Sequence, residues 1–203
     1  MRGLAATIVL LAAGESSRLG QPKQLLRLGQ QTLLRRAATE ALALGRGPVV
    51  VVLGAEAERL QAELAGLRLQ VCINEEWKEG MGSSIRAGVE ACLASEPETS
   101  RILIMLCDQP AVDRNALAHL LALHEEAGCP VTACAVEGRV QAPAVFEARL
   151  FGRLLQLRGD QGARELLRGG EIPVALVDLP QAALDVDRPE DLKTCRRRRE
   201  ESD

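Results

Sequence analysis

The stretch LLAAGESSRLGQPKQLL, residues 10–26, joins an apolar run to a polar loop with two glycines and two cations. The run from Thr7 to Leu11 suits a strand that is buried on both faces of a sheet. The loop matches neither the dinucleotide fingerprint G-x-G-x-x-G nor the Walker A pattern G-x-x-x-x-G-K-[ST]. Its glycines still let backbone N–H groups approach an anion, and Arg18 and Lys23 can contact phosphate oxygens. The loop predicts either a phosphate-binding site or an ordinary strand-to-helix turn with solvated cations.

Strand-like and helix-like segments alternate along the rest of the chain. The patterns predict further strands at 48–54, 67–74, 101–108, 131–136 and 172–179, and helices at 32–44, 55–64, 83–93, 114–126, 148–157, 161–167 and from about 189. The segment 137–146 has no clear period and can include a hairpin. Alternation of this kind is typical of βαβ units, so the predicted fold is a one-domain α/β fold with a mostly parallel sheet. Ligands of such sheets bind beyond the carboxyl ends of the strands.

Composition excludes several classes of protein. A net charge of −3, with one Trp, two Phe and no Tyr, argues against a nucleic-acid binder. No apolar run reaches the roughly 18 residues that a membrane helix needs. The six cysteines lie mostly in apolar runs without a metal-binding spacing, which indicates reduced thiols and a cytoplasmic location. The first residues mimic a signal peptide, but cleavage near Ala13 would remove the first strand, so a retained strand is favoured.

Five motifs in this order resemble the nucleotidyltransferases with a Rossmann-like fold, and most of all the molybdenum cofactor cytidylyltransferases. They are LAAGESSRLGQPKQLL (11–26), EGMGSSIRAG (79–88), LCDQP (106–110), GDQGAR (159–164) and DVDRPEDL (185–192). Together they span nearly the whole chain. The resemblance implies one Rossmann-like three-layer domain over residues 1–203, in which residues 1–110 bind the nucleotide and residues 111–203 bind the acceptor.

The resemblance also implies which residues contact the nucleotide. The first loop would surround the triphosphate, with Arg18 and Lys23 as catalytic cations that stabilise the leaving pyrophosphate. The implied nucleotide contacts are Leu11, Ala12, Ala13, Gly14, Ser16, Ser17, Arg18, Gly20, Lys23, Asn74, Gly80, Met81 and Ser84. Plain helix capping is the alternative role for the serines. Ala13 stands where cytidylyl enzymes tend to have Ala and guanylyl enzymes Gly, which predicts CTP as the donor.

Two carboxylates are candidate metal ligands. Asp108 directly follows an apolar strand, and Mg²⁺ prefers a few carboxylates together with phosphate oxygens and waters. A turn role is the alternative. By resemblance, Asp108 is the catalytic magnesium ligand and Asp187 the second ligand. Arg188 stands where relatives usually have Thr, so capping of the last helix is the alternative role of Asp187.

The acceptor side is less well defined. The motif GDQGAR implies that Asp160 and Arg164 contact the acceptor, with helix capping by Asp160 as the alternative. Gln141 and Ala142 precede Pro143 where relatives often carry Gly or His, which leaves the acceptor open. Separately, two histidines five residues apart on the helix at 114–126 are expected to be solvated surface residues; they are His119 and His124.

The resemblance therefore implies a Mg²⁺-dependent enzyme that moves CMP from CTP to a terminal phosphate of molybdopterin and releases pyrophosphate. Expected partners are CTP and a molybdopterin-type acceptor, and a client molybdoenzyme is a further candidate partner. Binding to nucleic acid or to a membrane is not expected. One alternative is guanylyl or other nucleotidyl transfer to a different phosphorylated acceptor. Another is a non-catalytic protein that delivers a cofactor to a molybdoenzyme. The presence of Arg18, Lys23 and Asp108 together favours an enzyme.

Overall fold

The computed structural model describes residues 5–15, 21–136, 138–167, 170–186, 190–191 and 195. The strands are β1 (Thr7–Ala12), β2 (Arg27–Leu28), β3 (Gln31–Thr32), β4 (Val49–Leu53), β5 (Gln70–Ile73), β6 (Arg101–Leu106), β7 (Val131–Val136), β8 (Arg139–Glu147) and β9 (Val174–Asp178). The α-helices are α1 (Leu33–Leu44), α2 (Ala57–Glu63), α3 (Met81–Ser95), α4 (Arg114–Ala127) and α5 (Phe151–Leu154). Short 3₁₀ helices are η2 (Lys23–Leu25), η3 (Trp77–Glu79), η4 (Ala148–Leu150), η5 (Ala163–Leu167) and η6 (Pro180–Ala183).

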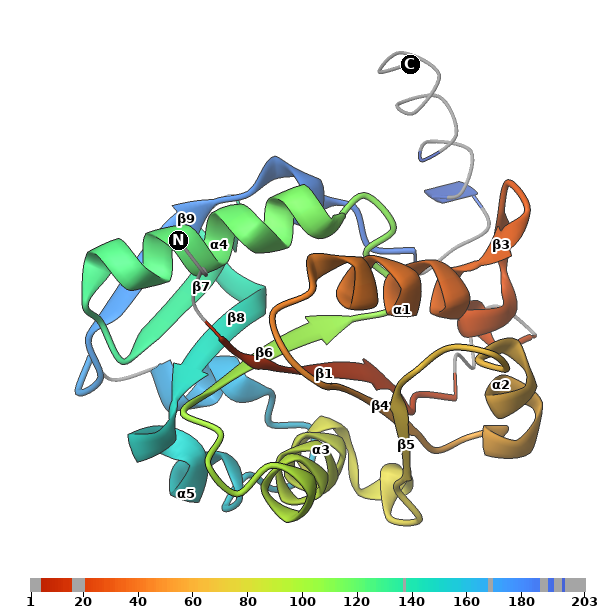
Figure 1. Cartoon of the computed structure of the whole chain (residues 1–203), viewed down its shortest axis with the longest axis horizontal. Helices are drawn as coiled ribbons and strands as arrows, with labels where there is room; N and C mark the ends of the chain where they lie inside the picture. Colours follow the sequence, from red (N-terminus) through yellow and green to blue (C-terminus); the bar gives the residue numbers. More distant parts are fainter. Residues whose placement is uncertain are drawn as a thin grey trace.

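Seven of these strands form one sheet in the order β5-β4-β1-β6-β8-β7-β9, and β2 pairs with β3 separately. The pairs β4–β5, β1–β4, β1–β6 and β7–β9 are parallel, whereas β8 runs antiparallel to both β6 and β7. Helices α1 and α4 cover one face of the sheet, and α3 and α5 cover the other (Figure 1). The predicted α/β fold with a mostly parallel sheet is confirmed.

Strand β1 is buried on both faces, as its unbroken apolar run predicted. Ile8 and Leu10 point into the cluster shared with α1 and α4, whereas Val9 and Leu11 point into the cluster shared with α3. All six of its residues are buried. Each fully buried side chain of this size stabilises the fold by about 1.5–3 kcal/mol. The strand is therefore anchored in both layers up to its carboxyl end at Ala12.

Several predicted elements differ in extent. The strand predicted at 67–74 begins only at Gln70, because residues 64–67 form a turn after α2. The helix predicted at 148–157 is a 3₁₀ turn followed by the short α5, and the helix predicted at 161–167 is the 3₁₀ helix η5. Gly159, with a positive φ of 58°, separates the two segments. The segment 137–146, where a hairpin was expected, does not contain one: its described residues belong to a turn and the single strand β8, which pairs with the preceding strand β7. The start of the last predicted helix lies outside the described residues.

The expectation of solvated histidines is wrong for His124. Its side chain is 3% exposed, and its Nδ1 lies 2.9 Å from Thr132 Oγ1 on β7. The position faces the sheet because it lies on the buried side of α4 with Leu117, Leu120 and Leu121. Burial lowers the pKa of His124, which favours the neutral form of its ring inside the core.

Within the described part of the chain, no helix combines the length and the apolar character that crossing a membrane requires.

Candidate functional site

A cleft of ≈ 360 Å³ lies at the carboxyl edge of the sheet, beyond β1 and β6. Its lining residues are Leu11, Ala12, Ala13, Gly14, Glu15, Lys23, Gln24, Trp77, Lys78, Gly80, Met81, Ser84, Leu106, Cys107, Asp108 and Asp160. They come from the loop after β1, the start of α3, the end of β6 and the GDQGAR segment. The fold thus brings four of the five sequence motifs to one cleft.

Most of the predicted nucleotide contacts that the structure describes line this cleft. They are Leu11, Ala12, Ala13, Gly14, Lys23, Gly80, Met81 and Ser84. Ser16, Ser17, Arg18 and Gly20 lie outside the described residues, as does the candidate metal ligand Asp187. For Arg164 the structure describes the backbone, in η5, but not the side chain.

The cation and the carboxylate predicted for catalysis meet directly. Lys23 Nζ donates to Asp108 Oδ2 at 2.5 Å, and their side chains are 20% and 13% exposed. Lys23 is positioned by Pro22, after which η2 begins, and Asp108 by the end of the buried strand β6. Asp108 Oδ1 is buried and has no hydrogen-bond partner among the described residues. A buried acceptor of this kind is costly unless a donor or cation reaches it, so the carboxylate is suited to bind a further charged group.

Gln24 fixes the backbone at the end of β1 and at Gly14 just beyond it. Its Nε2 donates to Ala12 O at 3.0 Å and to Gly14 O at 2.7 Å, and the residue is 1% exposed. Gln24 could not be recognised from the sequence, because a glutamine in a polar loop gives no periodic signal. The role of the Gln24 amide becomes visible only in the structure, where η2 packs against the end of β1 and the amide bonds to the backbone there.

Asn74 acts on the cleft through its neighbours. Its Nδ2 donates to Ser83 Oγ at 2.9 Å and to Ser84 Oγ at 3.1 Å, and its Oδ1 accepts from Glu76 N. Asn74 is 5% exposed and is not among the described residues that line the cleft, whereas Ser84 is. The side chain of Asn74 therefore holds the first turn of α3 in place at the cleft wall.

The start of α3 is joined closely to the GDQGAR segment. Gly82 N donates to Gly159 O at 2.9 Å, and Glu79 Oε1 accepts from Gly159 N at 3.1 Å. A Cβ at Gly80 would meet Asp160 Oδ1 and Gly159 O at 2.5 Å, which explains the glycine there together with its φ of 118°. The nucleotide side and the predicted acceptor side of the site thus share one rigid junction.

Arg86 reinforces this junction. It donates to Leu157 O and bonds Glu79 Oε2 at 2.6 Å and Glu76 Oε2 at 3.1 Å. The hydrogen bond from Arg86, and then the one from Gly159 N, lower the pKa of Glu79 to about 2. The pairing of Glu79 with Arg86 could not be recognised from the sequence, because their seven-residue separation spans a helix start and gives no recognisable charge pattern.

The described residues of the cleft offer few ligands for a metal ion. Among the described residues, no three His, Cys, Asp or Glu side chains lie together as a ready-made metal site. Asp108 alone, with its unpartnered Oδ1, fits Mg²⁺, which is typically held by one or two carboxylates plus phosphate oxygens. Burial raises the pKa of the adjacent Cys107 thiol, so this thiol stays protonated and is not a nucleophile.

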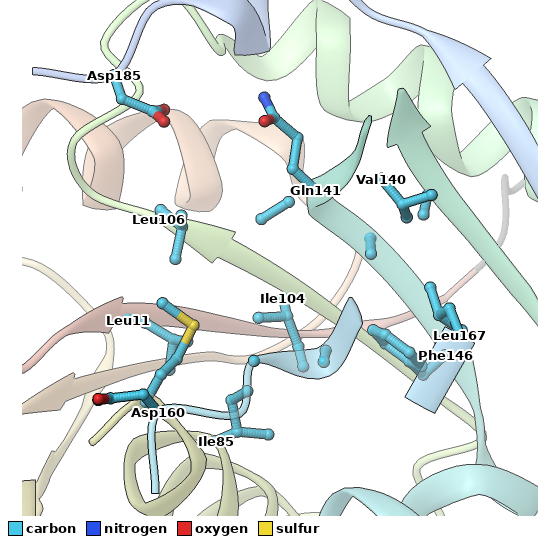
Figure 2. Close-up of a pocket in the computed structure, with 16 residues that line it drawn as sticks. Leu11, Ile85, Ile104, Leu106, Val140, Gln141, Phe146, Asp160, Leu167 and Asp185 are labelled. Atoms are coloured by element: carbon cyan, nitrogen blue, oxygen red, sulfur yellow. The ribbon is translucent and has the colours of Figure 1, made fainter. Parts of the chain in front are cut away.

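A second cavity of ≈ 280 Å³ adjoins the cleft, and Leu11, Met81, Leu106 and Asp160 line both. It lies between the sheet, the start of α3 and η5 (Figure 2). Three of its lining residues carry polar side chains, namely Gln141, Asp160 and Asp185. The others are apolar or glycine. The structure therefore places a second, largely apolar cavity beside the cleft that contains the Lys23–Asp108 pair.

Comparison with known proteins identifies the family. The MobA-like NTP transferase domain matches residues 8–178. A protein named nicotine blue oxidoreductase from Paenarthrobacter nicotinovorans is 35% identical over 179 residues, which cover 85% of this chain and 86% of that protein. The purine catabolism protein PucB from Bacillus subtilis is 29% identical, covering 93% of this chain and 95% of PucB.

Solved structures agree with this result. The crystal structure of Rv0371c from Mycobacterium tuberculosis has a TM-score of 0.79 and 30% identity, covering 96% of this chain and 98% of that one. A second crystal structure of Rv0371c is a complex with manganese, with a TM-score of 0.75 and 28% identity over 94% of this chain and 97% of that one. The chain belongs to the family of MobA-like NTP transferase domains and has the Rossmann-like fold of nucleotidyltransferases.

Proposed function

We propose that this chain transfers CMP from CTP to the terminal phosphate of a molybdopterin-type cofactor and releases pyrophosphate. The observation that carries the proposal is the Lys23–Asp108 pair, at 2.5 Å, in a cleft whose wall is the loop after β1. A nucleoside triphosphate is a polyanion that needs both cations and backbone N–H groups around it. Membership of a nucleotidyltransferase family supports this use of the cleft.

In the proposed reaction, an oxygen of the acceptor phosphate attacks the α-phosphorus of CTP. The bond from the α-phosphorus to the bridging oxygen breaks, and pyrophosphate leaves with the electron pair. The attacking oxygen is already ionised, so no protein base is required. Lys23 would neutralise charge that develops on the leaving group, and the backbone at Gly14, which Gln24 holds in place, would orient the phosphates. A divalent cation held by Asp108 would supply further charge neutralisation; Mg²⁺ is the proposed ion.

The proposed base preference depends on Ala13. This residue is 5% exposed, lines the cleft, and belongs to the apolar cluster on the α3 face, against which Trp77 packs. A Cβ at this position leaves less room for a base than a glycine does, which favours the smaller pyrimidine. We therefore propose CTP rather than GTP as the donor, with guanylyl transfer as the alternative within the same chemistry.

A second candidate function is the reduction of a flat substrate by a nicotinamide nucleotide. The name of the Paenarthrobacter nicotinovorans relative suggests oxidation–reduction chemistry, and the largely apolar cavity beside the nucleotide cleft is the observation that favours a flat substrate. The loop from Gly14 to Gly20 lacks the G-x-G-x-x-G pattern, which counts against dinucleotide binding. Nucleotidyl transfer therefore remains the first proposal.

Pyrophosphate release tests the proposal. The purified chain is mixed with each of the four ribonucleoside triphosphates, with and without molybdopterin, and with and without Mg²⁺. The expected result is release that requires CTP, molybdopterin and the metal together. A parallel assay follows the oxidation of NADH and NADPH by absorbance. Oxidation of NADH or NADPH without any pyrophosphate release would overturn the transfer proposal in favour of the second candidate. If neither pyrophosphate release nor oxidation of NADH or NADPH is detected, a non-catalytic delivery protein is favoured.

A further inference from the structure

We infer that Val186 is a positioning residue for the Lys23–Asp108 pair, because it is joined to the chain segments that carry both partners. The inference rests on the proposed function, since it names a residue that prepares the same site for transfer. It goes beyond the carboxylates and cations expected in the cleft, because an apolar side chain neither ligates a metal nor binds a phosphate. It does not depend on Asp187, which lies outside the described residues.

The first connection is a backbone hydrogen bond to Asp108. Val186 N donates to Asp108 O at 2.9 Å, so the segment after η6 is tied to the residue whose carboxylate meets Lys23. A peptide unit is planar and rigid, so a hydrogen bond to this carbonyl fixes the peptide that begins at Asp108. The bond therefore restrains the direction in which the Asp108 side chain leaves the backbone.

The second connection is apolar and reaches the segment of Lys23. Val186 is fully buried, and it packs in one small cluster whose other buried members are Leu26, Leu28, Leu33 and Cys195. Leu26 in turn bonds the backbone on both sides, because its N–H donates to Lys23 O at 3.0 Å and its carbonyl accepts from Leu33 N at 2.9 Å. The cluster thus links the side chain of Val186 to the 3₁₀ helix η2, which presents Lys23.

The segment that carries Val186 is held at a second point. Gln109 Nε2 donates to Ala182 O at 3.3 Å, and Gln141 Nε2 donates to the same oxygen at 2.6 Å. Gln109 is 3% exposed and Ala182 is fully buried. Residues 182–186 therefore form a strap that is fastened at both ends, and Val186 is not free to drift away from the pair.

The position of the pair matters for the proposed chemistry as much as its charge does. A lysine side chain has many rotamers, and it adopts one arrangement when the backbone and the partner around it are fixed. A misplacement of about 1 Å, caused by a change far from the reacting atoms, can lower turnover about 100-fold. Shortening Val186 removes an apolar contact and leaves both charges in the protein, so it tests position separately from chemistry.

The test compares Val186→Ala with Val131→Ala in the full chain. Both variants truncate a fully buried valine, but Val131 begins β7 at the amino edge of the sheet, opposite the cleft. The main readout is a double-mutant cycle of Lys23→Ala and Asp108→Ala in each background, measured by chemical denaturation. The cycle reports the coupling of the pair, which a general loss of stability does not change.

In wild type and in Val131→Ala, the pair should show a coupling of about twofold to 100-fold in the folding constant, the usual range for residues in contact. In Val186→Ala the coupling should fall below about twofold. Val186→Ile keeps a branched apolar side chain and should restore it.

Turnover is measured on the same proteins as pyrophosphate release from CTP and molybdopterin. Val186→Ala should lose roughly 10- to 100-fold, and Val131→Ala should stay within about twofold of wild type. Leu28→Ala opens the same cluster from β2 and should reproduce the loss of coupling and of turnover. It provides the decisive variant if Val186→Ala does not fold.

Four results would each overturn the inference: no coupling in wild type, unchanged coupling in Val186→Ala, an equal loss of coupling in Val131→Ala, or wild-type turnover in Val186→Ala. The outcome is separable from the proposed function, because the coupling is measured from folding alone. If the coupling falls as expected but wild type releases no pyrophosphate, the transfer proposal fails and the positioning of the pair by Val186 stands. If wild type transfers CMP and Val186→Ala does so equally fast, the positioning role fails and the transfer proposal stands.

Discussion

Lys23 and Asp108 are 85 residues apart in the chain, and their side chains meet at 2.5 Å at the carboxyl edge of the sheet. Lys23 lies on the loop that follows β1, and Asp108 follows β6, which is the parallel neighbour of β1. Parallel neighbours end at the same sheet edge, so the two motifs converge. The pair joins the two groups that the proposed transfer needs most, a cation for the leaving phosphates and a carboxylate for the metal.

Replacing Asp108 by Asn should keep the fold and lower turnover by about 100-fold or more, the scale of losing one electrostatic stabiliser. The reason is that the amide cannot hold a divalent cation as the carboxylate does. Pyrophosphate release and Mn²⁺ binding by electron paramagnetic resonance measure the effect. Asp113→Asn is the matched control, because Asn also caps a helix and Asp113 caps α4. Near-normal activity and metal affinity in folded Asp108→Asn would exclude Asp108 as a metal ligand.

Replacing Lys23 by Ala should weaken binding of CTP more than binding of CMP, because Lys23 is proposed to contact the β- and γ-phosphates that CMP lacks. Calorimetric titration of both nucleotides into both proteins measures the difference. Lys78→Ala is the control, since Lys78 lines the same cleft but lies over the ring of Trp77, with Nζ 5.4 Å from its centroid. Equal losses of CTP and CMP affinity in Lys23→Ala would show that Lys23 does not contact the β- and γ-phosphates.

Replacing Ala13 by Gly should narrow the preference for CTP over GTP, which is expected to be roughly 10- to 200-fold in kcat/KM for wild type. Removing the Cβ makes room for a purine, so the rate with GTP should rise. Competition between CTP and GTP, with wild type and with Ala13→Gly, measures this preference. Ala12→Gly loosens the backbone equally, but Ala12 points to the α1 face and should leave the preference unchanged. A wild type that prefers GTP contradicts the cytidylyl assignment.

Replacing Glu79 by Gln should make the protein less stable at neutral pH, and the difference should disappear in acid. The pKa of Glu79 is lowered from 4.5 to about 2 in the fold by the bond from Arg86 and then by that from Gly159 N. A lowered pKa gives stability that is present above the unfolded value of 4.5 and is lost as the pH falls toward 2. Denaturant melts of both proteins from pH 7 to pH 2 test this. A difference that stays constant over that range would contradict the ion pair.

Replacing Gly82 by Ala should destabilise the protein by about 1–3 kcal/mol, the usual cost of overpacking. The added Cβ would meet Arg158 N at 2.9 Å and Leu157 C at 3.0 Å, which are backbone atoms that cannot rotate away. Gly152→Ala is the control, because a Cβ there meets nothing within 4 Å. Chemical denaturation measures both. Equal stabilities of the two variants would show that the junction between α3 and the 157–160 segment adapts freely.

The regular half of the fold was predictable because its signals are local. Strands β1, β4 and β6 are largely apolar runs, and Asp113 caps the start of α4. The second half was harder to predict. Residues 148–167 contain helix formers, but Gly152, Gly159 and Gly162 interrupt them, and the segment folds mostly as short 3₁₀ turns around the junction with α3. His124 was misjudged because its neighbours in space, not in sequence, decide its burial.

The sequence by itself determined the α/β class, the order of the motifs and the chemical identity of the groups in the cleft. The tertiary structure decided how those groups are arranged. It paired Lys23 with Asp108, joined the amide of Gln24 to the backbone of Ala12 and Gly14, turned Asn74 toward the serines of α3, and left a largely apolar cavity lined by Ala133 and Ala144. These relationships depend on strand order and register across residues that are far apart in the chain, and local propensity carries no information about which strands will become neighbours.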